Sequence, residues 1–318
     1  MNTLNILFFG STADSVLVAE KLYATRYPLL TLNISAVVTQ PPRPVGRKRV
    51  VTPTPVEIWA KEHDIVALSF PSNPEKSWLY ADETQVIDAL EPIKADLLVS
   101  ASYGQKIPTK TLADATFGGL NVHPSLLPRW RGGDPVPWAI LTGDHQTGVT
   151  VVSLSEKFDE GLIYAQEKIP ITDQDTSGLL RTKLFGIGAK LLADLLPQYV
   201  QGKAKGVPQL GKDEPRAARF SRDVGYEPWD TVLKAFTNAE EASRIERKYR
   251  ALHPWPGVWT TIATQVRPAA LVHSIDEQEK RLKILKLHLN NGLLAIDEVQ
   301  LEGKNPVSWQ QFRAAYEI

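Results

Sequence analysis

The chain has 318 residues, of which 43% are hydrophobic and 23% charged, and its 36 Lys and Arg residues balance its 36 Asp and Glu residues. This balance excludes a strongly basic surface that would bind nucleic acid through its overall field, but it leaves room for a local basic patch. The absence of cysteine excludes disulfides, zinc–thiolate sites, thiol nucleophiles and iron–sulfur clusters.

The first two hundred residues alternate short apolar runs with helical spacing. Apolar runs predict strands at 5–10, 32–38, 66–70 and 96–100, and helical spacing is found at 16–23, 57–63 and 86–90. This alternation predicts an α/β fold with a parallel sheet and right-handed crossovers. In such sheets the ligand lies at the carboxyl ends of the strands. No apolar run approaches the roughly 20 residues that span a bilayer.

Beyond this region the composition changes. Residues 202–222 are polar, rich in Lys, Gly and Pro, and are predicted to be a linker. A helix is expected at 239–252. It contains a basic cluster, which we interpret as a solvated helix face and which consists of Arg244, Arg247, Lys248 and Arg250. Alternating strands at 258–263 and 282–289 follow, and an Asn-Gly turn at 291–292 indicates a hairpin. We therefore expect two domains, 1–205 and 206–318, the second small and β-rich.

The segment 118–132 carries the strongest local signal, reading GGLNVHPSLLPRWRG. Residues two apart on a strand point to the same side, so the side chains of Asn121 and His123 face one space. Acyl transfer to an amine needs such a pair, to stabilise an oxyanion and to move a proton. An isolated Asn-x-His pair is short and common, however, and more often marks a hydrogen-bonded strand end.

The flanking residues resemble a family signature. From Asn121 to Gly132 the chain is similar to NxHxSLLPxYRG of the folate-dependent formyltransferases, with Trp130 in place of the commoner Tyr. The resemblance implies a Rossmann-like catalytic domain and a smaller C-terminal β-barrel domain of OB-like type. It also implies that Asn121 and His123 are catalytic, and that 10-formyltetrahydrofolate is the formyl donor.

An aspartate completes the catalytic set in this family. Residues 147–152, TGVTVV, resemble the family strand that precedes the catalytic loop, and the loop here reads EKFDEGLI at 156–163. The resemblance therefore implies Asp159 as the third catalytic residue. A carboxylate near His123 favours the charged imidazolium, which would best stabilise a negative oxygen.

Folate contacts are implied by the same resemblance, because the family binds the pterin through backbone groups of the loops that follow the strands. Ser102-Tyr103-Gly104 resembles the family's AYG turn. The implied folate-binding residues are Ser102, Tyr103, Gly104, Ser125, Leu126, Leu127, Pro128, Glu160 and Gly161.

Residues 40–56, QPPRPVGRKRVVTPTPV, are basic, with no acid between Glu20 and Glu57. Pro and Gly predict an irregular exposed loop, whose cations suit a phosphate backbone, although a solvated basic loop is commoner for a charge run. The stretch resembles TQPDRPAGRGKKLxPSPV of the family members that act on methionyl-tRNA. The resemblance implies initiator methionyl-tRNA as the acceptor, contacted by Arg43, Arg47, Lys48 and Arg49.

Two alternatives stay open. The FDEGLI loop and Trp138 are closer to members that formylate nucleotide-linked amino sugars. The other alternative is a non-catalytic Rossmann-like module that binds a nucleotide or RNA. Two features argue against this alternative: the chain has Asn121, His123 and Asp159, and it lacks GxGxxG after the first strand. We expect a cytoplasmic monomer that binds no metal and no membrane.

Overall fold

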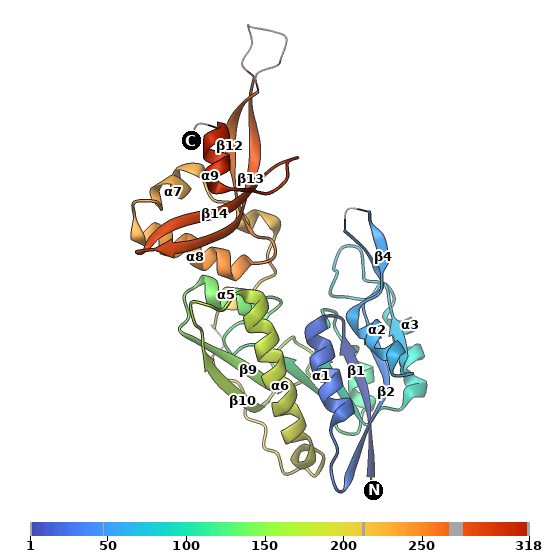
Figure 1. Cartoon of the computed structure of the whole chain (residues 1–318). Coiled ribbons are helices and arrows are strands. Elements are labelled where there is room, and N and C mark those ends of the chain that lie inside the picture. Colours follow the sequence, from blue (N-terminus) through green and yellow to red (C-terminus); the bar gives the residue numbers. More distant parts are fainter. Residues whose placement is uncertain (1, 47, 212–213, 267–275, 317–318) are drawn as a thin grey trace. The chain divides into compact units, whose positions relative to one another are not determined.

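The computed structural model describes residues 2–46, 48–211, 214–266 and 276–316 (Figure 1). The chain forms two compact units, the first made of residues 1–135, 146–170 and 180–218 and the second of residues 136–145, 171–179 and 219–318. Each unit has its own main sheet. Among the described residues, no helix has the length and apolar character needed to cross a membrane.

The first unit is built on a seven-stranded sheet in the order β10-β9-β7-β6-β1-β2-β5. Its strands are β1 (Asn2–Gly10), β2 (Leu30–Thr39), β5 (Val66–Ser69), β6 (Leu97–Ala101), β7 (Gly119–His123), β9 (Gln146–Ser153) and β10 (Ile163–Pro170). The predicted parallel arrangement is confirmed for β5, β2, β1, β6 and β7. In this mostly parallel sheet, β9 and β10 run antiparallel to their neighbours. Only residues 154–162 join these two strands, too few for the crossover that parallel neighbours need.

Helices α1 (Ala13–Ala24), α2 (Pro55–Glu62), α3 (Glu83–Leu90), α4 (Thr109–Asp114) and α6 (Ser177–Val200) accompany this sheet, with a 3-10 turn at Glu91–Ile93. Helix α1 begins at a capping box, in which the Thr12 side chain accepts a hydrogen bond from the Ser15 backbone. Along β1, Ile6 to Phe9 are at most 1% exposed, which is typical of a strand covered on both faces. The core of the first unit therefore lies around its central strands.

The central strands bring three loops to one edge of the sheet. Gly10 at the end of β1 is paired with Ala101 at the end of β6, and Ala101 is paired with Val122 of β7. Because these strands are parallel, the loops that follow them emerge side by side. The loops after β6 and β7 contain seven of the residues for which the sequence implied a function, Ser102–Gly104 and Ser125–Pro128.

The chain returns to this edge after α6. Val207 exchanges backbone hydrogen bonds with Ile163 at the start of β10. Farther along, β11 (Arg216–Ala217) pairs in parallel with β8 (Arg131–Gly132). The described residues of 206–218, which are 206–211 and 214–218, were expected in the linker and the second domain but belong to the first unit. Their polar composition conceals this packing because it is made mainly by backbone groups.

The second unit contains a four-stranded antiparallel sheet in the order β12-β13-β14-β15. Its elements are α5 (Pro135–Leu141), a 3-10 turn at Arg222–Gly225, α7 (Trp229–Lys234), α8 (Ala239–Leu252), β12 (Val258–Val266), β13 (Asp276–Asn290), β14 (Leu293–Leu301), β15 (Val307–Ser308) and α9 (Trp309–Tyr316). The hairpin prediction is confirmed, with positive φ at Asn291 and Gly292 between β13 and β14. Within the described residues the structure thus has the small antiparallel β-domain that was expected after the catalytic domain.

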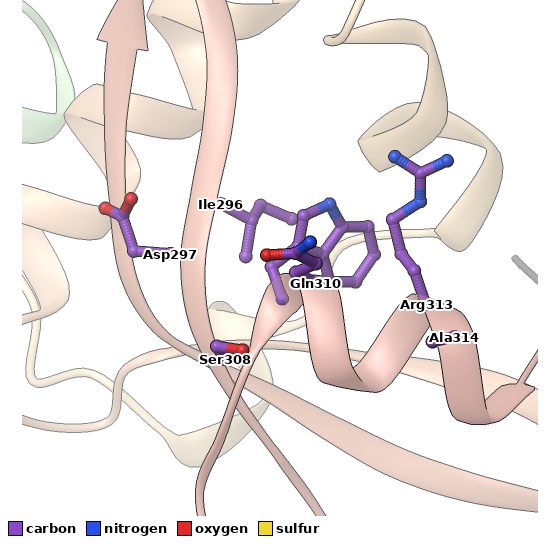
Figure 2. A pocket seen from close by; sticks show the side chains of 7 residues that line it. Ile296, Asp297, Ser308, Gln310, Arg313 and Ala314 are labelled. Carbon is purple, nitrogen blue, oxygen red and sulfur yellow. The ribbon is translucent and has the colours of Figure 1, made fainter.

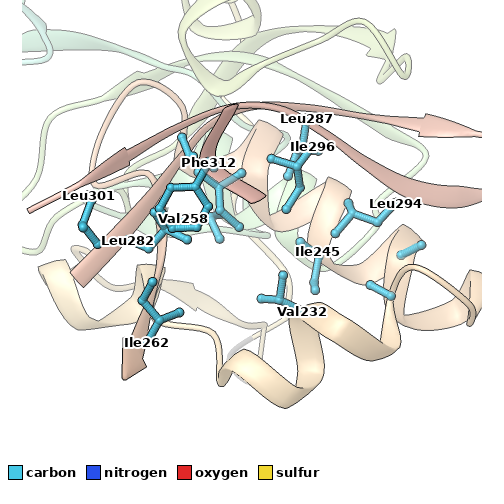
Figure 3. Packing of buried hydrophobic residues seen from close by; sticks show 14 residues of the cluster. Val232, Ile245, Val258, Ile262, Leu282, Leu287, Leu294, Ile296, Leu301 and Phe312 are labelled. Atoms are coloured by element: carbon cyan, nitrogen blue, oxygen red, sulfur yellow. The ribbon is translucent and has the colours of Figure 1, made fainter. Parts of the chain in front are cut away.

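One face of this sheet is covered by helices (Figure 3). Val232 of α7, Ile245 of α8 and Phe312 of α9 meet side chains of three strands, among them Val258, Leu282 and Ile296. All of these side chains are at most 6% exposed. Burial of this apolar area, at about 25 cal/mol per Å², is the main stabilising term for a small unit of this kind.

The basic residues of α8 do not form the solvated face that we expected. Arg244 donates to both carboxylate oxygens of Glu227, at 2.8 and 2.7 Å, and Lys248 donates to the same carboxylate at 2.6 Å. Arg250 is 8% exposed and is paired with Glu246. Burial of Glu227 raises its pKa, but the hydrogen bonds from Arg244 and Lys248 outweigh burial and hold the pKa below its ordinary value.

Replacing Glu227 with Gln is expected to lower the free energy of unfolding by about 2 kcal/mol at pH 7, because two cations lose a buried partner while Arg244 keeps partial solvation. A carboxylate whose pKa is lowered by folding stabilises the folded state at pH values above its unfolded-state pKa, which is near 4.3 for Glu. This stabilisation is lost as the pH falls through the folded-state pKa. The difference in free energy of unfolding between the variant and the wild type should therefore become smaller below about pH 4. Urea denaturation at several pH values measures this difference, and Glu302→Gln, at an exposed position, is the control. A difference that does not depend on pH would contradict the lowered pKa of Glu227.

Candidate active site

Three polar side chains that the sequence singled out meet at the carboxyl edge of the first sheet. Asn121 and His123 lie at the end of β7, and Asp159 lies in the loop between β9 and β10. Oδ1 of Asp159 is 3.2 Å from Nδ2 of Asn121 and 3.3 Å from Nδ1 of His123. The His123 and Asp159 side chains are only 5% and 9% exposed. The structure thus joins an amide, an imidazole and a carboxylate in one partly enclosed cluster.

Both ring nitrogens of His123 face oxygen acceptors. Nε2 is 3.0 Å from the backbone carbonyl oxygen of Trp130, and Nδ1 faces the Asp159 carboxylate. A carbonyl and an ionised carboxylate can only accept hydrogen bonds, so the doubly protonated imidazolium satisfies both contacts. Both nitrogens of the His123 ring are therefore occupied by contacts within the first unit.

The Asp159 carboxylate is held on its second oxygen as well. Oδ2 accepts a 2.9 Å hydrogen bond from the Gly132 backbone N–H. The backbone of Asp159 is left-handed, with φ of 58°, a conformation that non-glycine residues adopt rarely and mostly where the surroundings fix it. Trp130, whose carbonyl faces His123, is left-handed too, with φ of 63°. Two unusual backbone conformations thus lie next to the same pair of side chains.

The loop that carries Asp159 is pressed against β9. The Leu162 N–H donates to Oγ of Ser153 at 2.8 Å, and the Ser153 N–H donates to the Leu162 carbonyl at 2.9 Å. A Cβ on Gly161 would lie 1.9 Å from the Ser153 carbonyl oxygen, so only glycine fits there. The loop is therefore fixed at its C-terminal end.

The residues implied for folate binding lie in the loops at this edge. Ser102 and Gly104 have positive φ directly after β6. The Tyr103 side chain turns inward, 3% exposed, and its hydroxyl is 2.8 Å from that of Tyr80. Burial raises the pKa of both hydroxyls, which stay neutral. In this turn, backbone groups are thus better placed to meet a ligand than the Tyr103 ring.

The loop after β7 is held by hydrogen bonds within the loop and by hydrogen bonds to β9 and β10. The Leu127 N–H donates to Oγ1 of Thr150 at 3.2 Å, and the Leu127 carbonyl accepts from Nε2 of Gln166 at 2.8 Å. Ser125 is 1% exposed, and its hydroxyl donates to the Arg129 carbonyl at 2.8 Å. Leu126 and Pro128 are partly exposed in the same loop. The folate contacts implied for these four residues stay a prediction.

The Glu160 side chain turns to cations of the first unit. It is hydrogen-bonded to Arg216 of β11, and Lys157 is 3.9 Å away. The hydrogen bond from Arg216 lowers the pKa of the Glu160 carboxyl. Glu160 thereby ties the Asp159 loop to the returning segment 206–218, a contact that the sequence did not indicate.

The basic stretch forms a hairpin where an irregular loop was expected. Strands β3 (Arg43–Val45) and β4 (Val50–Thr52) pair antiparallel, away from the main sheet (Figure 1). Arg43, Lys48 and Arg49 are exposed, as predicted, and Arg47 lies outside the described residues. Val45, Val50 and Val51 are 57–64% exposed. The hairpin therefore presents cations together with apolar side chains.

The second unit contains a hollow that is separate from the cluster of Asn121, His123 and Asp159. A hollow of about 580 Å³ in the second unit lies between β14 and α9 (Figure 2) and is lined by Ile296, Asp297, Ser308, Trp309, Gln310, Arg313 and Ala314. None of the residues with an implied function lines it. Within the described part of the chain, no three His, Asp or Glu side chains are grouped so that they could hold a metal ion.

Comparison with known proteins identifies the family. Residues 4–196 match the model of the formyl transferase family, and residues 237–317 match the model of the formyl transferase C-terminal domain. The chain belongs to the formyl transferase family.

Relatives within this family cover 81–96% of this chain. A methionyl-tRNA formyltransferase from Enterococcus faecalis is 34% identical over 96% of this chain and 94% of its own. One from Listeria monocytogenes is 40% identical over 81% of this chain and 75% of its own. HypX from Aquifex aeolicus, solved in complex with tetrahydrofolic acid, shares the fold at a TM-score of 0.57 and 15% identity, over 98% of this chain and 47% of that one.

Three groups at the site of this formyl transferase were not predicted from the sequence. The Gly132 N–H and the Trp130 carbonyl lie inside the family signature, but a backbone contact leaves no trace in the side-chain pattern. Gln209 bonds to the Asp159 loop and lies in the segment interpreted as a linker. A single Gln among polar residues carries no pattern, so only the fold could reveal it.

Proposed function

We propose that this formyl transferase moves a formyl group from 10-formyltetrahydrofolate to the amino group of initiator methionyl-tRNA. The meeting of Asn121, His123 and Asp159 at the carboxyl edge of the sheet carries the proposal. The names of the relatives at 34–40% identity support this acceptor over an amino sugar. Trp138, which had favoured the sugar acceptor, stacks on Phe220 with ring centroids 4.9 Å apart, so packing accounts for it.

The donor fits the chemistry of the site. Transfer needs neutral and cationic donors for a developing oxyanion and a group that accepts a proton, and the three side chains supply these. The tetrahydrofolic acid bound by the HypX structure of the same fold supports a folate donor. We assign the folate to the loops that contain Ser102–Gly104, Ser125–Pro128 and Glu160–Gly161. No metal has a part in the proposal.

In the proposed reaction the bound donor supplies the formyl carbon. As the amine attacks, the second amide N–H of Asn121, which the Asp159 contact does not use, donates to the formyl oxygen. The imidazolium of His123 lies beside the developing negative charge and stabilises it. One proton must pass from the amine to the departing nitrogen of the donor. Asp159 and His123, 3.3 Å apart, are the pair that relays it.

A competition assay tests the acceptor. The enzyme is mixed with 10-formyltetrahydrofolate, charged initiator tRNA and a nucleotide-linked amino sugar, and formylation of each amine is followed in a single turnover. We expect formyl-methionyl-tRNA and no formylated sugar. Formylation of the sugar with none of the tRNA would replace the proposed acceptor, and no product with an active donor would refute the transfer itself.

The hairpin of β3 and β4 is assigned to the acceptor arm of the tRNA. Its exposed cations suit phosphate oxygens, for which Arg provides forked donors. Residues 1–205 are proposed to act as the catalytic domain and residues 206–318 to contribute tRNA contacts. Arg244 and Lys248 of the second unit are paired with Glu227. A cytoplasmic monomer stays our prediction.

Replacing Arg43, Arg47, Lys48 and Arg49 together by Ala is expected to weaken tRNA binding and to reduce the slope of log K against log salt by about 3, because each neutralised phosphate contributes about 0.7–0.9 to that slope. Filter binding across a salt series measures the slope. The matched control removes four exposed cations elsewhere in the first unit, Lys168, Lys183, Lys203 and Lys205. Equal slopes in the two variants would contradict a specific role for the hairpin.

A further inference from the structure

Gln209 lies where the returning segment 206–218 crosses the Asp159 loop. The segment is anchored on both sides of Gln209. Before it, Val207 and Ile163 exchange backbone hydrogen bonds of 2.8 and 2.9 Å. After it, the Pro215 carbonyl accepts from the Trp130 N–H at 2.9 Å, and the Ala217 carbonyl accepts from the Gly133 N–H at 2.8 Å. The backbone around Gln209 is therefore held independently of its side chain.

The Gln209 amide uses both of its ends. Its Nε2 donates to the backbone carbonyls of Asp159 and Gly161, both at 2.8 Å. Its Oε1 accepts from Nε and Nη2 of Arg131, at 2.9 and 2.7 Å. The two partners fix the amide orientation, because a flipped group would set its oxygen against two carbonyls and its NH₂ against a guanidinium. Arg131 is itself only 7% exposed.

These contacts link the turn that carries Asp159 to the strand β8, which donates a hydrogen bond to the Asp159 carboxylate. On one side Gln209 holds the carbonyls of the left-handed turn that carries Asp159. On the other it holds Arg131, whose neighbour Gly132 donates its N–H to Oδ2 of Asp159. The Gln209 side chain thus connects the strand that donates to the Asp159 carboxylate with the turn that carries it.

We propose that Gln209 is a positioning residue, which holds Asp159 in the orientation that meets Asn121 and His123. This inference rests on the proposed function for its effect on catalysis, but not for its effect on the loop. Gln209 itself touches no reacting atom in the proposed reaction. Since misplacing a catalytic group by about 1 Å can cost about 100-fold in rate, loss of this brace should lower kcat much more than it raises KM.

Two variants test the brace in the full chain. Gln209→Met keeps the length of the side chain and removes all four hydrogen bonds. Gln209→Glu keeps an acceptor for Arg131 but loses both donors and sets a carboxylate against the carbonyls of Asp159 and Gly161. Leu210→Ala is the matched control, since Leu210 is the next residue in the same segment and is 84% exposed.

The first readout needs no substrate. Hydrogen exchange of a peptide that spans 156–163 should be at least about 10-fold faster in both Gln209 variants than in Leu210→Ala, while β1 and β6 exchange unchanged. The second readout is formylation of methionyl-tRNA, where kcat should fall about 100-fold in both variants with KM changed by less than about 3-fold.

The outcomes separate this inference from the proposed function. Unchanged exchange at 156–163, or full activity in Gln209→Glu, would overturn the positioning role, the latter because the two donated hydrogen bonds would then be dispensable. A protein that shows the faster exchange but formylates no tRNA, even as wild type, would refute the proposed function and leave the brace in place. Faster exchange throughout the first unit would reduce Gln209 to a general structural role and also contradict the inference.

Discussion

Replacing His123 by Ala is expected to lower kcat for formylation of methionyl-tRNA about 10³-fold. The ring is 5% exposed on its side chain and lies between the Trp130 carbonyl and the Asp159 carboxylate, so its interactions in the proposed reaction are screened little by water. Alanine removes both the cation that stabilises the oxyanion and one partner of the proton relay. Binding of tRNA through the distant hairpin should persist, so KM for tRNA should change by less than about 3-fold.

Single-turnover formylation at saturating enzyme measures the loss, and thermal melting confirms that the variant is folded. His145→Ala is the control, because His145 is exposed and lies outside the cluster. A variant of His123 with more than about a tenth of the wild-type rate would show that the reaction does not depend on the imidazole.

Replacing Asp159 by Asn should lower kcat by about 10³-fold with little effect on folding. Asn tolerates the left-handed backbone that Asp159 adopts at φ of 58°, so the backbone is not strained by the change. The amide also keeps the shape needed to accept from the Gly132 N–H. What disappears is the negative charge that faces His123 and the capacity to accept a proton in the relay.

The comparison of Asp159→Asn with Asp159→Ala separates charge from backbone. Alanine in the left-handed region adds about 1 kcal/mol of strain, so the Ala variant should melt earlier than the Asn variant while both lose the same activity. Rates measured in single turnovers and melting temperatures read the two effects. An Asn variant that kept most of its activity would assign the proton relay to His123 and water alone.

Much of this protein was predictable because its signals are local. Alternation of apolar runs with helical spacing predicted the parallel strands, and Asn291-Gly292 predicted the hairpin of the second unit. Strand periodicity set Asn121 and His123 on one side of β7, and the structure brings both to Asp159. Their catalytic roles and the folate and tRNA contacts stay predictions that the proposed experiments test.

Errors arose where long-range pairing decides the outcome. The sequence did not set the direction of β9 and β10, and the short loop between them requires the antiparallel pairing. On α8, a cluster of cations was expected to form a solvated face, but Glu227, which precedes α7, pairs with Arg244 and Lys248. A charge run does not reveal a partner that is distant in the sequence.

The zero net charge of the chain excluded a generally basic surface, and the sequence by itself located the exception in the stretch from Arg43 to Arg49 and the catalytic candidates in 121–159. Only the tertiary structure decided how Asp159 is held. Asp159 is held by hydrogen bonds from the Gly132 N–H to its carboxylate and from the Gln209 amide to the carbonyls of Asp159 and Gly161. Every residue except proline has the same backbone donor and acceptor, so a site fixed through backbone groups becomes visible only when the chain has folded around it.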